Sequence, residues 1–140
     1  MKVMPIFHDD QHGTAIVTLA GLINAAKIVD KDMKECKMVI NGAGAAGITI
    51  AKLLLNYGVK DIVICDSTGA IYRGREKNMN AAKRKIAEFT NVNNKAGSLK
   101  DVIKGTDVFI GVSIERALHG HWVSSMNKKS IVLAMANPIP

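Results

Sequence analysis

The alternation of apolar and polar positions divides the chain into short strands and amphipathic helices. Apolar residues recur at spacings of three and four from residue 14 to about residue 30, which predicts a long helix. Polar side chains occupy only a narrow face of this helix, so we expect it to be well buried. Short apolar runs predict four strands, at residues 37–41, 61–65, 107–112 and 130–136.

Further helical patterns lie between these strands. One follows the glycine-rich segment after residue 41 and stops at Gly58, a residue type that commonly ends helices. Three shorter helices are predicted at residues 76–89, 98–105 and 122–126, with loop or turn regions at 67–75 and 91–97, the second with room for a very short strand. Strands that alternate with helices form βαβ units. The pattern therefore predicts one α/β domain over residues 1–140, with a parallel sheet flanked by helices.

Composition and charge exclude several classes of protein. Apolar residues make up 48% of the 140 residues and charged residues 22%, which is ordinary for a folded domain and excludes intrinsic disorder. The net charge of +7 favours anionic ligands. The basic residues are spread along the chain, and the densest cluster, residues 83–85, has no interleaved aromatics for stacking on bases. We therefore expect no nucleic-acid partner.

The two cysteines and the lack of targeting segments favour the cytoplasm. Cys36 and Cys65 form no CxxC pair and are too few for a disulfide-stabilised secreted domain, so we expect a reducing compartment and no disulfide. No apolar stretch reaches the roughly 18 residues that a membrane span requires. The N-terminus also lacks the features of a signal peptide.

A glycine-rich loop supplies the clearest chemical motif. The sequence GAGAAG at residues 42–47 directly follows a predicted strand and begins a predicted helix. In dinucleotide-binding folds the first glycine permits the tight turn, the second lets the backbone approach a pyrophosphate, and the third lets helix and strand pack closely. The N–H groups at the helix N-terminus bind phosphate. The pattern predicts a Rossmann-like fold, with cofactor-binding residues Gly42, Gly44, Ala45, Ala46 and Gly47.

An acidic residue at the end of the next strand bears on the choice of cofactor. Asp66 lies about 20 residues after the loop, the separation expected of a carboxylate that binds ribose hydroxyls. A carboxylate there would repel the 2′-phosphate of NADP, so Asp66 favours NAD. Arg73 and Arg75 leave an alternative open, because a loop arginine can accept that phosphate. Both arginines could equally be solvated on the surface.

Two histidine-containing segments are weaker candidates. Asp9 and Asp10, within HDDQH at residues 8–12, suit a hard cation such as Mg²⁺ or Mn²⁺. The same carboxylates could instead cap the following helix, and the residues alone do not decide between the two roles. The spacing of His8 and His12 suits zinc only if the segment is helical, which Gly13 disfavours. The segment HGH at residues 119–121 lacks a third ligand and is typical of an exposed loop.

Taken together, these motifs resemble the malic enzymes, in their bacterial short form. The matching stretches are PIFHDDQHGTA (5–15), NGAGAAG (41–47), DVFIGVS (107–113) and LAMANPIP (133–140), and with the spacing between them the resemblance covers essentially the whole chain. It implies oxidative decarboxylation of malate to pyruvate and CO₂, with a nicotinamide cofactor and a divalent cation that stabilises the enolate as a Lewis acid. The cofactor expected here is NAD, with Mg²⁺ or Mn²⁺.

The resemblance also implies roles for particular residues. Asp10 matches a metal ligand, and Asp9 matches a residue that orients a catalytic lysine. Asn137 matches a residue that contacts substrate and lies near the cofactor, and Ser113 matches a position near the nicotinamide. Asp66 and the loop glycines match cofactor positions.

The family's N-terminal domain, which carries a catalytic tyrosine, a catalytic lysine and two more acidic ligands, has no match in these 140 residues. The family's C-terminal end, which supplies another substrate-binding asparagine and closing helices, has no match either. We therefore expect a cofactor-binding fragment that is inactive by itself and that assembles as a homo-oligomer. Two alternatives stay open. One is a cofactor domain of the amino-acid dehydrogenase type, and the other is a non-enzymatic nucleotide-binding module.

Overall fold

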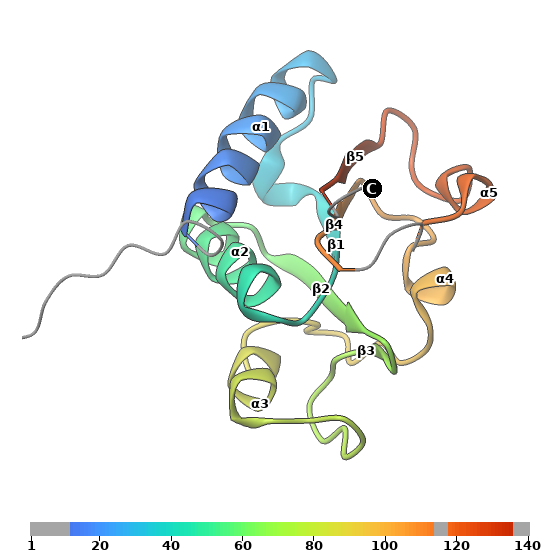
Figure 1. Cartoon of the computed structure of the whole chain (residues 1–140). Helices are drawn as coiled ribbons and strands as arrows, with labels where there is room; N and C mark the ends of the chain where they lie inside the picture. The colour runs from blue at the N-terminus through green and yellow to red at the C-terminus, as the bar shows by residue number, and fades with distance from the viewer. Residues whose placement is uncertain (1–11, 114–117, 136–140) are drawn as a thin grey trace, which may run out of the picture.

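A five-stranded sheet forms the centre of the domain. The computed structural model describes residues 12–113 and 118–135. The strands lie in the order β3-β2-β1-β4-β5 (Figure 1). The pairs β2–β1, β1–β4 and β4–β5 are parallel, and β3 pairs with β2 in the antiparallel direction. The strand bounds are β1 (Lys37–Asn41), β2 (Asp61–Asp66), β3 (Gly69–Ala70), β4 (Val108–Gly111) and β5 (Ile131–Ala134).

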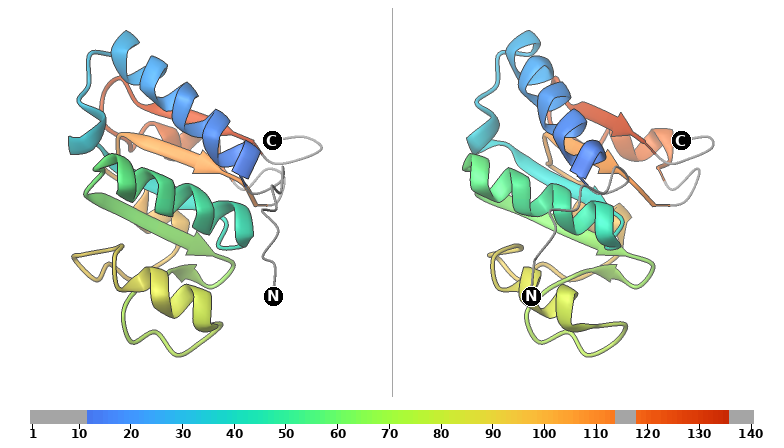
Figure 2. Two further views of the ribbon diagram at one scale, coloured as in Figure 1. Left: turned by 90° about the vertical axis from the view of Figure 1, so that its left-hand side faces the viewer. Right: turned by 60° about the vertical axis from the view of Figure 1, so that its left-hand side comes forward.

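Helices cover both faces of this sheet and enclose two apolar cores. Helices α1 (Thr14–Ile28), α2 (Ala45–Tyr57) and α3 (Ala81–Ala87) lie on one face (Figure 2). The short helices α4 (Leu99–Val102) and α5 (Gly120–Val123) lie on the other, and a 3₁₀ turn, η2 (Met33–Glu35), precedes β1. Successive side chains of a strand point to opposite faces. Accordingly, Ile40 and Ile64 join the larger core under α1–α3, whereas Val39 and Phe109 join the core under α4 and α5.

The predicted α/β architecture is confirmed, with corrections at three places. The helix predicted over residues 76–89 begins only at Ala81, because Asn80 accepts a hydrogen bond from the Lys83 N–H (2.9 Å) and so caps the helix. The predicted loop at 67–75 contains β3, the antiparallel edge strand. No strand forms at 91–97, where the Asn91 side chain instead accepts from the Lys95 N–H (2.8 Å) and closes a turn.

Cys36 and Cys65 are buried, free thiols. Burial raises the pKa of Cys65 to about 12, so its thiol stays protonated at neutral pH. In the described part of the chain, every helix is too short or too polar to cross a bilayer.

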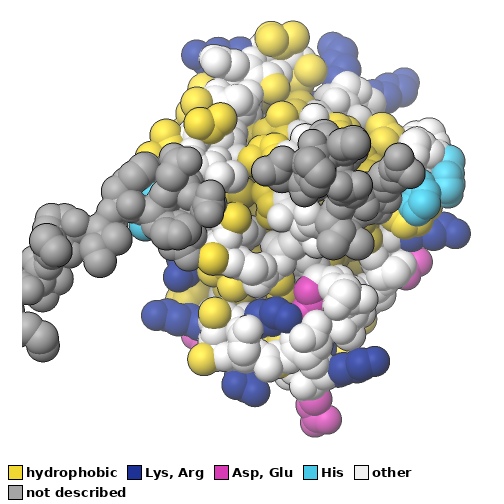
Figure 3. All heavy atoms as spheres, in the orientation of Figure 1, with side chains coloured by type: hydrophobic (Ala, Val, Ile, Leu, Met, Phe, Trp, Pro, Cys, Tyr) yellow, Lys and Arg dark blue, Asp and Glu magenta, His cyan; other side chains and the backbone are white. Residues whose placement is uncertain are grey.

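Helix α1 is more exposed than its apolar sequence predicts. Ala15, Leu22 and Ala26 are buried, but the side of α1 that faces away from the sheet is also apolar. Ile16 and Val17 are 56% and 69% exposed. Figure 3 shows hydrophobic side chains gathered over and beside this helix. Apolar patches of this kind usually mark interfaces, so the prediction that α1 is well buried is wrong for the chain by itself.

We expect the chain to self-associate at high concentration through this face of α1. Replacing Val17 and Ile28 by lysine should shift it toward monomer in multi-angle light scattering, because each lysine would have to be desolvated in the contact. Val92→Lys, at an equally exposed apolar position away from α1, is the matched control and should change nothing. A wild-type chain that stays monomeric at high concentration would contradict this expectation.

Candidate dinucleotide-binding site

The turn between β1 and α2 contains three glycines, and only two of them are required by the fold. Gly42 has a φ of +131°, and a Cβ there would lie 2.9 Å from Val112 Cγ2. A Cβ on Gly47 would lie 1.8 Å from the Gly42 carbonyl oxygen, so only glycine lets the helix pack this closely on the strand. Gly44 differs, because its φ of −78° suits any residue and a Cβ would meet nothing within 4 Å. The fold requires Gly42 and Gly47, whereas the open position at Gly44 leaves room for a ligand.

The N-terminus of α2 is a ready anion-binding site beside this opening. Gly44 is the N-cap and contributes no side-chain capping bond, and the first turn holds no acidic residue. The N–H groups of Ala45, Ala46 and Gly47 have no acceptor within the helix, as in every α-helix, and the dipole makes this end positive. Both features favour a phosphate-bearing ligand.

A groove of about 360 Å³ lies at the carboxyl ends of the strands; Asn41, just before the glycine loop, lines it, and residues 42–47 do not. Two of the sequence-predicted residues, Asp66 after β2 and Ser113 after β4, line it. Ligands of open α/β sheets bind at this edge. The groove also has lining residues that sequence reasoning missed. They come from β1, from the turn between β2 and β3, from β3, and from α4 with its N-cap and α5: Asn41, Ser67, Thr68, Gly69, Ser98, Leu99, Lys100 and Trp122.

Asp66 lies within a buried cluster of charges. Its Oδ1 accepts from the Thr68 N–H (2.9 Å) and from Arg75 Nη1 (3.0 Å). Its Oδ2 accepts from Lys83 Nζ (2.8 Å) and from Arg75 Nη2. The Asp66 side chain is only 7% exposed. Arg75 Nη2 and Lys83 Nζ also donate to the Asn78 carbonyl, which ties both cations to the loop before α3.

This cluster keeps Asp66 ionised. Burial opposes the charge, but the hydrogen bonds from Arg75, Lys83 and the Thr68 N–H outweigh it and lower the Asp66 pKa from 3.8 to about 2. A carboxylate has about four acceptor positions, and here four donors reach it. A ribose hydroxyl that binds Asp66 would therefore share or displace one of these donors.

Of the two loop arginines, Arg73 agrees with the surface interpretation and Arg75 does not. Arg75 is buried, and both of its Nη atoms are occupied by Asp66 and by backbone carbonyls, so it is not a solvated surface residue. Arg73 is exposed and donates to the Glu88 carbonyl. Lys83, part of the basic run at 83–85, is likewise buried against Asp66 rather than solvated.

The remaining predicted residues fall outside this groove. Asp9, Asp10 and Asn137 lie outside the residues that the structure describes. Within residues 12–113 and 118–135, no group of three or more His, Cys, Asp or Glu side chains is arranged to hold a metal ion. His119 and His121 are exposed, and their rings pack near Trp122, with centroids 4.4 Å and 5.8 Å from it.

Comparison with known proteins decides the family. The profile of the family described as "Malic enzyme, NAD binding domain" matches residues 11–140. The chain belongs to the malic enzyme family. Among curated members it is 62% identical over 137 residues to the "Bifunctional malic/malolactic enzyme" of Bacillus subtilis and 53% identical to the "NAD-dependent malic enzyme" of Geobacillus stearothermophilus. These alignments cover 98% of this chain but only 33% and 28% of the two relatives, so the chain spans about a third of a malic enzyme.

Solved malic enzyme structures share its architecture. The NAD-dependent malic enzyme of Thermotoga maritima superposes with a TM-score of 0.94 at 42% identity, over 98% of this chain and 37% of that one. A hetero-hexameric glutamate dehydrogenase from Thermus thermophilus matches with a TM-score of 0.64 at 18% identity. That second likeness shows the fold alone. The amino-acid dehydrogenase type of cofactor domain therefore shares this fold, and the glycine-rich loop alone does not distinguish it from a malic enzyme.

We expect Asp66→Asn to destabilise the domain by about 3–5 kcal/mol, because it leaves Arg75 and Lys83 buried without a counter-charge. The matched control is Asp101→Asn, whose exposed carboxylate accepts from Ser98 in a helix cap, and which should destabilise the domain clearly less than Asp66→Asn. Urea unfolding at neutral pH measures both changes. Equal losses in the two variants would contradict a buried charge cluster.

The lowered pKa of Asp66 also predicts how acid acts on the domain. A carboxyl whose pKa falls on folding adds stability that is complete above its unfolded pKa of 3.8 and is lost as the pH falls toward about 2. The wild-type protein should therefore lose stability over this range more steeply than Asp66→Asn, as followed by thermal unfolding. Parallel curves for the two proteins would contradict the assignment.

Proposed function

We propose that this chain is the NAD-binding unit of a malic enzyme, which oxidises and decarboxylates malate to pyruvate and CO₂. The proposal is supported by the open position at Gly44 beside the N–H groups at the N-terminus of α2, together with the groove at the strand ends. Membership of the malic enzyme family supports the substrate and the reaction. The name of the Bacillus subtilis relative, a malic/malolactic enzyme, supports malate in particular.

The residues of this chain would hold the dinucleotide at three points. The N–H groups of Ala45, Ala46 and Gly47 would donate to the pyrophosphate across the gap left by Gly44. Asp66 would contact the ribose nearer the adenine, at the carboxyl end of β2. Ser113, after β4, lies along the same groove and would border the nicotinamide half. When bound, NAD supplies the acceptor for the hydride that leaves C2 of malate.

We infer that NAD is preferred over NADP. The sequence argument was that Asp66 repels the 2′-phosphate, whereas the structural argument concerns the cations around Asp66. Repulsion by Asp66 is weakened, since two cations neutralise it. Those cations are already committed, because Arg75 and Lys83 are buried and bonded to Asp66 and to the Asn78 carbonyl. A 2′-phosphate could recruit either one only by breaking a buried ion pair, which is costly. Relatives are named with both cofactors, as NAD-dependent and as NADP-dependent malic enzymes.

The other parts of the proposal rest on the family resemblance. Asp10 would be a ligand of Mg²⁺ or Mn²⁺, Asp9 would orient the family's catalytic lysine, and Asn137 would contact substrate. Homo-oligomerisation through α1 and a cytoplasmic location, which suits two buried free thiols, complete the proposal.

We expect the chain to bind NAD⁺ more tightly than NADP⁺, as measured by isothermal titration calorimetry. Gly44→Val should weaken NAD⁺ binding by at least about tenfold, because its side chain would fill the space reserved for the pyrophosphate. Its backbone angles and surroundings accept a side chain, so the variant should fold. Gly21→Ala, at a position with equal free space on α1, is the matched control.

This titration tests the binding site and the cofactor preference separately. Unchanged NAD⁺ affinity in Gly44→Val would contradict the proposed site. Tighter binding of NADP⁺ would overturn the cofactor preference and leave dinucleotide binding intact.

We also expect the 140-residue chain alone to form no NADH from malate, even with NAD⁺ and Mn²⁺. Proton transfer by a positioned acid or base contributes about 10²–10⁴-fold each, and the family's tyrosine and lysine have no match here. Joining the chain to the N-terminal domain of a malic enzyme should restore turnover, and Asp10→Asn should abolish it again. Malate-dependent NADH formation by the purified chain would contradict this expectation.

A further inference from the structure

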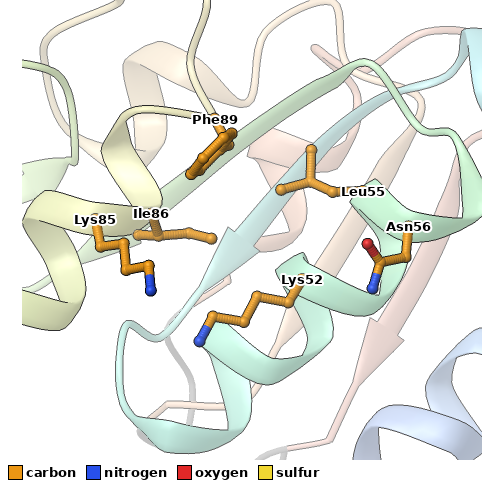
Figure 4. A pocket seen from close by; sticks show the side chains of 6 residues that line it. All are labelled: Lys52, Leu55, Asn56, Lys85, Ile86 and Phe89. Carbon is orange, nitrogen blue, oxygen red and sulfur yellow. The ribbon is translucent and has the colours of Figure 1, made fainter.

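A second cleft lies between α2 and α3, on the face of the sheet that also carries α1. It has a volume of about 300 Å³. Lys52, Leu55 and Asn56 of α2 line one side, and Lys85, Ile86 and Phe89, on and just after α3, line the other (Figure 4). It shares no lining residue with the groove at the strand ends, and none of the proposed NAD contacts lies in it.

The cleft has an apolar part and a cationic end. Ile86 is buried at its base, and Phe89 is 58% exposed, which is unusual for so large an apolar side chain. In Figure 4 the ammonium groups of Lys52 and Lys85 lie toward one end, with Phe89 and Leu55 toward the other. The lining therefore matches a molecule with a charged head and an apolar body.

The charge at the cationic end is not neutralised by its own helices. Neither α2 nor α3 contains an acidic residue, and Glu88, the C-cap of α3, lines a different pocket. The ion pairs among the described residues use Lys31, Lys60, Arg75 and Lys83, and none uses Lys52 or Lys85. Two like charges brought together from separate helices favour an anion between them.

We propose that this cleft binds a small monocarboxylate with an aromatic or branched apolar body. The carboxylate lies between the Lys52 and Lys85 ammonium groups, and the apolar body packs on Leu55, Ile86 and the Phe89 ring. The volume is at the lower end of the range for small-molecule sites, which limits the ligand to a compact one. Because the two sites are separate, the acid binds with NAD⁺ present as well as without it, so this proposal stands or falls independently of the proposed function.

The experiment is a titration of the ¹⁵N-labelled chain with 3-phenylpropionate, followed by amide chemical shifts. We expect saturable shifts confined to residues 52–56 and 85–89, unchanged by NAD⁺. Acetate, which lacks the apolar body, and 3-phenylpropanol, which lacks the charge, should each bind more weakly.

Substitutions separate the charge from the apolar contacts. Lys52→Met and Lys85→Met should each weaken binding of 3-phenylpropionate by about two- to fivefold, as expected for an exposed ion pair. Phe89→Ala should weaken it as well, and Lys27→Met on α1 is the control. All three cleft positions are at the surface, so the variants should fold. Absence of saturable shifts, equal affinity for the alcohol, or shifts spread over α1 would overturn the proposal.

Discussion

The close approach of α2 to the end of β1 is the constraint on which the rest of the structure depends. A Cβ on Gly47 would lie 1.8 Å from the Gly42 carbonyl oxygen, so two glycines fix the first turn of the helix against the sheet. This contact points the free N–H groups of α2 along the carboxyl edge of the sheet. The same edge carries the ends of β2 and β4, and so the groove, Asp66 and Ser113 come together there. The phosphate site is thus a consequence of backbone packing.

The buried charge cluster is the second organising feature of the site. Asp66 connects the end of β2 to the loop at 67–79 through Arg75 and to α3 through Lys83. Removing one partner from a buried ion pair is costly, so this cluster holds the loop in place beside the groove. The cluster also limits how readily Asp66 can bind a ligand. The carboxylate stays ionised but is not free, and any ribose that reaches it must compete with donors already in place.

Much of this architecture could be predicted from the sequence, because its signals are local. Val/Ile runs predict buried strands, and Gly58, with φ of +113°, ends α2 as its residue type suggests. What the sequence did not reveal depends on tertiary contacts. The burial of Arg75 and Lys83 requires Asp66, which is 9 and 17 residues away. Lys100 and Trp122 reach the groove from helices of the opposite face, and no periodicity predicts that. The edge strand β3 has only two residues, too few for any pattern.

The most direct test of the central claim is a crystal structure of the chain with NAD⁺ bound. We expect pyrophosphate oxygens within hydrogen-bonding distance of the Ala45 and Ala46 N–H groups, against the open side of Gly44. We also expect the adenosine ribose beside Asp66 and the nicotinamide half running toward Ser113. A dinucleotide bound elsewhere, with the N-terminus of α2 free of phosphate, would contradict this expectation.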